Sequence, residues 1–143
     1  MKSTRWAAGI AGLWAGVLLG VGLIGAPAGF AAALPEIAGR AAGRMFAQEA
    51  YLSLALALAM CLLLRRRPQG QIQPGAVFSV NLMLTLGALF CTVAGYFALQ
   101  PMMAAARAGE GAVSFGALHG LSAGFYALKT GLVVALAWRL TAR

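Results

Sequence analysis

The sequence predicts an all-α protein, a bundle of four transmembrane helices with a short interfacial helix between the first and the second. Hydrophobic residues make up 62% of the 143 residues and charged residues only 10%, and a soluble protein of this composition would expose large apolar patches to water. The apolar residues also gather in stretches long enough to cross a bilayer, over 6–33, 45–64, 77–99 and 115–138. We therefore expect a single integral membrane domain over residues 1–143, with the lipid bilayer as its solvent.

The first stretch has two interpretations, because Lys2 and Arg5 precede it as basic residues precede a cleaved secretory signal. Its apolar run is longer than the hydrophobic region of a signal, which has about 7–15 residues. It also carries Gly12, Gly16 and Gly20 at four-residue spacing, a pattern typical of helices that pack closely in a membrane. A discarded peptide does not need such a pattern, so we expect the stretch to be retained as span one.

The segment between spans one and two, LPEIAGRAAGRMFAQEAY, has helical periodicity of its own. Pro35 is typical of a first helical turn, and Glu36, Arg40, Arg44 and Gln48 recur every fourth residue along one side. The opposite arc holds small and apolar residues: Leu34, Ala38, Ala41, Ala42 and Met45. This pattern predicts the short interfacial helix, running directly into span two.

The formal net charge of +8 does not predict a nucleic-acid interface, because the basic residues flank the spans. Seven flanking charges fall on the side of the termini, including Arg65, Arg66 and Arg67, and three fall on the other side, Arg40, Arg44 and Arg107. The positive-inside rule then places both termini in the cytoplasm, and we expect a multi-pass protein of a bacterial inner membrane. Arg65–Arg67, in a loop broken by proline and glycine, would fix this topology beside anionic lipids.

Span four carries a polar face within an apolar helix. His119, Ser122, Tyr126 and Lys129 fall within about 80° of one another when residues are placed at 100° intervals. Span three has a polar line of its own, formed by Asn81, Thr85, Thr92 and Tyr96. Because polar groups are costly against acyl chains, we expect the two faces to meet each other or a cavity.

Lys129 is the unusual member of this face. It lies ten residues before Arg139, roughly 15 Å into the membrane, where an ammonium costs at least about 2.5–3.5 kcal/mol. Glu49 is expected at roughly 24 Å on the same scale, so the sequence predicts that no carboxylate of the same chain reaches Lys129. Four interpretations stay open: extension to the inner headgroups, a neutral amine hydrogen-bonded to Thr85 or Asn81, an anionic ligand or lipid, and a carboxylate of a partner chain.

His119, the single histidine, is expected at the outer mouth of the bundle. It is either a hydrogen-bonding tether or a ligand to a soft metal or haem, with Met102 and Met103 as companions. One histidine excludes bis-histidine haem ligation within one chain. The sequence has no aspartate for a Ser-His-Asp set and no HExxH motif, so we do not expect an enzyme.

Small residues predict how the spans associate. Gly12, Gly16 and Gly20 of span one would face a matching stripe in span four: Gly116, Gly120 and Gly124. We expect this pairing within one chain, and a homo-oligomer is the alternative use of the stripes. Cys61 and Cys91 differ in expected depth by more than about 10 Å, so both are predicted to be free thiols.

Motifs in a fixed order add a family resemblance. They are Ala26-Pro27 with Phe30, Ala38-Gly39-Arg40, Gly43-Arg44 with Phe46, and Leu118-His119-Gly120-Leu121-Ser122. Together they resemble the four-helix membrane family known as domain of unknown function 4149, which is related to the eukaryotic transmembrane protein 205. The resemblance covers nearly the whole chain and implies a four-helix membrane fold without an assigned activity; the eukaryotic relative is associated with resistance to platinum drugs. Where such sequences have an asparagine seven residues after the histidine, this chain has Tyr126, so no role is carried over there.

The function that these features favour is binding or transport of a small solute or soft metal along a polar pathway between spans three and four. The predicted pathway residues are His119, Ser122, Tyr126, Lys129, Asn81, Thr85 and Glu49. One alternative is a structural or partner-binding membrane subunit. A second is a protein that handles haem or copper in the membrane.

Overall fold

The computed structural model describes residues 2–65 and 79–142, and these residues form helices and short connections without a strand. The first span is α1 (Lys2–Leu19), the π-helical segment η1 (Gly20–Gly25) and α2 (Ala26–Ala32). The second is the single helix α3 (Pro35–Arg65). The third is α4 (Val80–Thr92), the π-helical segment η2 (Val93–Ala98) and α5 (Leu99–Arg107), and the fourth is α6 (Phe115–Thr141). The all-α prediction is confirmed.

Four of the described helical segments are long and apolar enough to cross a membrane: Arg5–Ala32, Pro35–Arg65, Val80–Arg107 and Phe115–Thr141. A helix begins at Pro35 and continues into span two without a break, as predicted, and its interfacial position stays a prediction. With 31 residues, α3 is about 46 Å long and exceeds the roughly 30 Å of a hydrocarbon core. Its first turns therefore extend beyond the length that a span requires.

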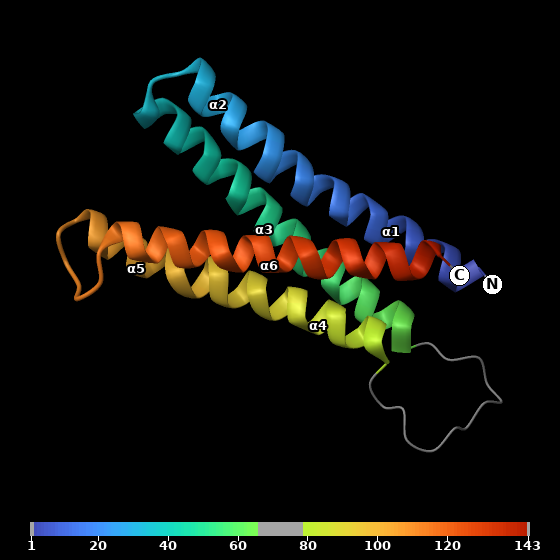
Figure 1. Cartoon of the computed structure of the whole chain (residues 1–143). Helices are drawn as coiled ribbons and strands as arrows, with labels where there is room; N and C mark the ends of the chain where they lie inside the picture. Colours follow the sequence, from blue (N-terminus) through green and yellow to red (C-terminus); the bar gives the residue numbers. More distant parts are fainter. Residues whose placement is uncertain (1, 66–78, 143) are drawn as a thin grey trace.

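The bundle has the shape of a V (Figure 1). The helices converge at the end where both termini lie, and two helical hairpins separate toward the other end. The α2–α3 arm consists of η1, α2 and the first half of α3, and the α5–α6 arm consists of η2, α5 and the first half of α6. The side of the membrane that the termini face stays a prediction.

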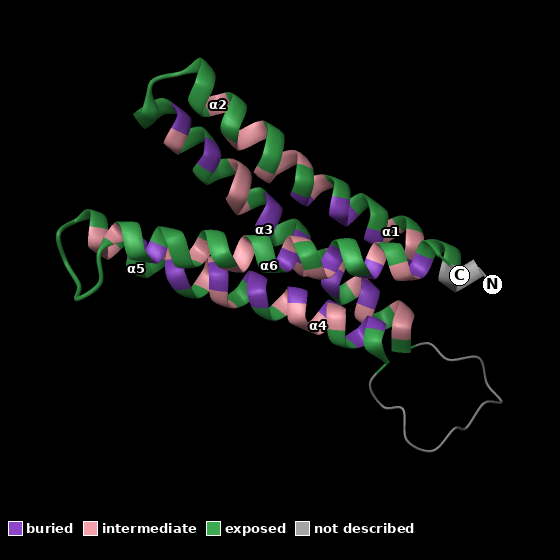
Figure 2. Ribbon diagram, in the orientation of Figure 1, coloured by how far each residue is buried: buried purple, intermediate pink, exposed green. Residues whose placement is uncertain are grey.

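The converged half holds the main core. Its cluster includes Trp14, Leu18, Met60, Val133 and Leu136, each fully buried. In contrast, neither η1 nor α2 contributes a buried residue, and Figure 2 shows α2 without buried ribbon. A smaller cluster of Leu99, Met103 and Leu118 holds α5 against α6 in the other arm.

Two hydroxyls of α6 bind backbone carbonyls at the π-helical segments. A π-turn widens the helix and leaves a carbonyl without its usual donor four residues on. The Tyr126 hydroxyl donates to the Leu18 carbonyl in α1, two residues before η1 (2.8 Å), and the Ser122 hydroxyl donates to the Gly95 carbonyl in η2 (2.7 Å). The polar face of α6 thus fixes the points at which spans one and three change their helical geometry.

The glycine stripes do not perform their predicted role within the chain. Helices α1 and α6 do pack against each other, but β-carbons added at the six stripe glycines would meet nothing within 4 Å: Gly12, Gly16, Gly20, Gly116, Gly120 and Gly124. The buried side of α1 instead carries Ala7, Ala11, Trp14 and Leu18. The large Trp14 ring holds the interface, and the stripes face away from it. Cys61 and Cys91 are free thiols, as predicted.

Candidate functional site

A buried ion pair lies where the two arms meet. The Lys129 Nζ is 2.8 Å from each carboxylate oxygen of Glu49, and both side chains are only 3% exposed. The prediction that no carboxylate of the same chain reaches Lys129 is therefore wrong. The amine neither extends to the inner headgroups nor bonds to Thr85 or Asn81, because Thr85 donates to its own helix and Asn81 accepts from Arg139.

The error has a geometric cause. Counting residues from Arg65 and Arg139 gives depth only if the two helices run parallel and begin at one plane. Helix α3 crosses α6 obliquely instead (Figure 1), so equal numbers of residues do not give equal depths. The long, flexible stem of Lys129 closes the remaining separation.

The ion pair is part of a hydrogen-bonded chain through three helices. The Trp14 Nε1–H of α1 donates to the Ser53 Oγ (2.8 Å), and the Ser53 hydroxyl donates to Glu49 one turn earlier in α3. Trp14 and Ser53 are 0% and 1% exposed. Neither Trp14 nor Ser53 was predicted as a site residue from the sequence. The four-residue spacing of Glu49 and Ser53 could have indicated their contact, whereas nothing in the sequence indicates Trp14.

This network leaves the buried charges satisfied. Among the described residues, every buried side-chain nitrogen and oxygen has a hydrogen-bond partner. The Lys129 Nζ also lies 4.9 Å from the centroid of the Tyr126 ring, a cation–π contact. Since an unpaired buried charge is far more costly than a paired one, Glu49 and Lys129 depend on each other.

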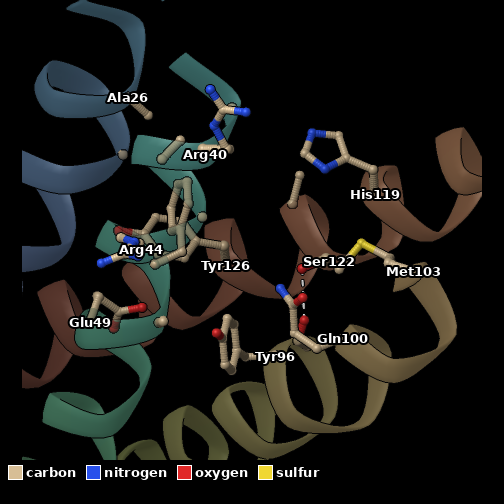
Figure 3. Close-up of a pocket in the computed structure, with 18 of the residues that line it drawn as sticks. Ala26, Arg40, Arg44, Glu49, Tyr96, Gln100, Met103, His119, Ser122 and Tyr126 are labelled. Carbon is tan, nitrogen blue, oxygen red and sulfur yellow. Dashed lines mark hydrogen bonds between the residues drawn. The ribbon is translucent and has the colours of Figure 1, made fainter. Parts of the chain in front are cut away.

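A cleft of about 1080 Å³ opens between the arms, and its lining includes both residues of the ion pair. Figure 3 shows part of this lining, with Glu49 on α3. The lining comes from both arms. The aromatic residues of the lining come from α2, α3 and α6: Phe30, Phe46, Phe115 and Tyr126. The uncharged polar residues are Tyr96, Gln100 and Ser122. Figure 3 shows Arg40 and Arg44 on α3 across the cleft from His119 and Met103.

The charged groups of the lining are unevenly paired. Arg40 forms an ion pair with Glu36 (2.8 Å), and Glu49 is engaged with Lys129. No carboxylate of the described residues lies within ion-pair distance of Arg44 or Arg107. The Arg107 guanidinium lies over the Phe115 ring, 4.5 Å from its centroid. The cleft therefore carries a surplus of positive charge.

His119 lies at the open side of the cleft. Its ring stacks on Phe115 with centroids 5.7 Å apart and an interplanar angle of 17°. Met103 also lines the cleft, but Met102 does not and is 46% exposed. No group of three or more His, Cys, Asp or Glu side chains within the described ranges could hold a metal ion. The three residues named for a metal, His119, Met102 and Met103, thus do not all face one space.

The structure divides the predicted pathway. His119, Ser122, Tyr126, Lys129 and Glu49 all line the cleft. Asn81 and Thr85 are buried near the start of α4, in the converged half, and do not line it. Of the predicted topology residues, Arg65 is exposed at the end of α3, while Arg66 and Arg67 lie outside the described residues.

Comparison with known proteins gives one match. The model of the family described as Domain of unknown function (DUF4149) matches residues 9–112. The matched range contains Glu49, both π-helical segments and the α2–α3 arm, and it ends before α6. No curated protein and no solved structure matches the chain.

Proposed function

Because this chain belongs to the DUF4149 family, whose description supplies no activity, we propose from its geometry that it is a membrane protein that binds a small solute between its two arms. The observation that carries the proposal is the cleft of about 1080 Å³, at the upper end of the size of small-molecule sites. Such sites combine apolar walls with a few convergent polar groups. Phe46, Tyr126 and the ion pair supply that combination here.

The cleft lies between the separated arms, away from the end where both termini lie. The converged half is filled by the core around Trp14, Leu18 and Met60, so a solute in the cleft has no path through the bundle in this conformation. Transport by the same site requires a second conformation in which the converged half parts. With both termini in the cytoplasm of a bacterium, as the basic residues predict, the cleft opens toward the outer side of the inner membrane.

Native mass spectrometry after mild solubilisation tests the proposal. We expect the purified protein to retain a small molecule that is lost from an Ala123→Trp variant, because Ala123 lines the cleft. Ala55→Trp is the matched control, since Ala55 is also exposed but does not line the cleft. Retention of the same molecule by all three proteins at equal thermal stability contradicts binding in the cleft.

The same purified proteins can be used to test for a bound metal or haem. Metal analysis measures a soft metal held by His119 and Met103, and a visible spectrum of protein made with haem available measures a Soret band. A stoichiometric metal or haem that Ala123→Trp removes would identify the solute as that group. Its loss on His119→Ala would identify the ligand.

A second candidate function is a structural subunit that associates through its glycine faces, as a homo-oligomer or with another membrane protein. The supporting observation is that the α6 stripe, Gly116, Gly120 and Gly124, faces away from the bundle with open space at each β-carbon position. Close helix approach in membranes uses such surfaces. Gly120→Leu should reduce self-association measured by cross-linking in vesicles, and Ala55→Leu should not. Equal cross-linking of both variants and the parent protein contradicts this role.

A further inference from the structure

We infer that the solute of this cleft is an amphiphilic anion, whose phosphate or carboxylate group binds Arg44 and whose apolar part lies on the aromatic wall. The inference rests on the proposed function and names the chemical class of its solute. It selects an anion over a cationic metal and over an uncharged molecule.

The lining of the cleft carries more basic than acidic side chains. Four basic side chains, Arg40, Arg44, Arg107 and Lys129, face two acidic ones, Glu36 and Glu49. Both acids are already paired, Glu36 with Arg40 and Glu49 with Lys129. The two positive charges left over repel a metal cation and attract an anion.

Arg44 is a basic side chain of the lining without an ion-pair partner among the described residues. It lies in α3, four residues after Arg40 and five before Glu49, and Figure 3 shows it on α3 near Glu49. The Glu49 carboxylate is occupied by Lys129 and Ser53. Arg44 lines the cleft and is exposed, so its guanidinium is accessible to a ligand, and the planar group matches phosphate or carboxylate with two hydrogen bonds.

The aromatic side chains of the lining indicate that the ligand also has an apolar part. Phe30, Phe46 and Phe115 line a space far larger than a phosphate or carboxylate group needs. Apolar surface of this extent gains free energy only when an apolar part of the ligand covers it. The Phe115 ring contacts both the Arg107 guanidinium and the His119 ring. A positive charge therefore lies directly beside the aromatic surface.

Two sources can supply such an anion: a soluble amphiphile, or an anionic lipid whose headgroup enters between the arms. Calorimetry in nonionic detergent tests the soluble source with hexyl phosphate, inorganic phosphate and hexanol. Native mass spectrometry tests the lipid source, with protein taken from nanodiscs of phosphatidylcholine that contain phosphatidylglycerol. Hexyl phosphate should bind at least about tenfold more tightly than inorganic phosphate, and hexanol should not compete with it. Retained phosphatidylglycerol that hexyl phosphate displaces identifies the lipid as the source.

The variants make the test specific. Arg44→Gln should weaken hexyl phosphate binding by about 10- to 100-fold, because it removes a charge-assisted hydrogen bond. Arg107→Gln should weaken it less, because this charge lies at the end of α5 and acts mainly through the field of the cleft. Arg65→Gln is the matched control: it removes the same charge from the same helix at the opposite, exposed end and should leave binding unchanged.

The results separate this inference from the function on which it rests. Equal losses in Arg44→Gln and Arg65→Gln, or binding of hexanol as tight as that of hexyl phosphate, overturn the anion. If a different molecule still co-purifies and Ala123→Trp removes it, the cleft is a binding site for another class of solute. If Ala123→Trp leaves hexyl phosphate and every co-purified molecule in place, the cleft itself is not the site.

Discussion

The converged half of the bundle and the separated arms are built from the same helices but differ in how their side chains are packed. In the converged half, α1, α4 and α6 surround large side chains such as Trp14 and Leu136, which are fully buried. In the arms, η1 and α2 bury nothing, and the facing walls carry arginine, glutamine and tyrosine around open space. The difference shows where this molecule uses side chains for cohesion and where it leaves room for a ligand.

The boundary between the halves is polar. The Glu49–Lys129 ion pair and the Tyr126 hydrogen bond to Leu18 lie at the level where the arms separate. The charged pair borders the cleft on one side and the core on the other. The comparison therefore predicts the largest loss of stability when the buried ion pair at the boundary is broken, and no loss when a small side chain is added at a residue that faces the open cleft.

Breaking the ion pair should give the largest effect. Lys129→Met leaves the Glu49 carboxylate buried without its cation, and we expect a loss of about 3–5 kcal/mol in unfolding free energy. Thermal unfolding in detergent measures it. The double variant Glu49→Gln/Lys129→Met removes both charges and should recover most of the loss. A single variant as stable as the parent protein would mean that the pair does not connect the two halves.

The next effect concerns the hydrogen-bonded chain behind the ion pair. Trp14→Phe keeps an aromatic ring in the core but removes the Nε1–H donor to Ser53. We expect a loss of about 1–3 kcal/mol, the cost of leaving a buried polar group without its partner. The control is Trp138→Phe, because Trp138 is 74% exposed. Equal losses in both variants would contradict a specific role for the Trp14 hydrogen bond.

Two glycines differ in the space around their β-carbon positions. A β-carbon on Gly95 of η2 would overlap the Cβ of Phe125, and we expect Gly95→Ala to cost about 1–3 kcal/mol by overpacking. Gly43 lines the cleft and has open space at the same position. Gly43→Ala should be neutral or stabilise the protein by up to about 1 kcal/mol through helix propensity. Unfolding midpoints of the two variants measure the contrast, and a reversed order would contradict the open cleft.

Among the destabilising variants, the smallest losses are expected at the two α6 hydroxyls that bind the backbone near the π-helical segments. Ser122→Ala removes the hydrogen bond to the Gly95 carbonyl, and Tyr126→Phe removes the one to the Leu18 carbonyl. Each should cost about 1 kcal/mol. Hydrogen exchange should show faster exchange in η2 for Ser122→Ala and in η1 for Tyr126→Phe. Exchange that rises equally along all four spans would contradict local anchoring.

The polar face of α6 could be predicted from the sequence, whereas the hydrogen-bond partners of its side chains could not. Helical periodicity placed Ser122, Tyr126 and Lys129 on one side, and the structure has all three lining the cleft. Periodicity could not indicate their partners, because each partner comes from another span: Gly95, Leu18 and Glu49. The same limit applies to span three, where Thr85 shares the polar arc of Tyr96 by sequence but lies in the core rather than in the cleft.

The four apolar helical segments follow from the sequence alone, because they depend on residue type and on the length of each apolar run. Tertiary packing alone gives the contact of Glu49 with Lys129, the outward-facing glycine stripes and the cleft between the arms. Crossing angles between helices control all three features. They are set by the side chains of several helices packing at once, and no single helix contains that information.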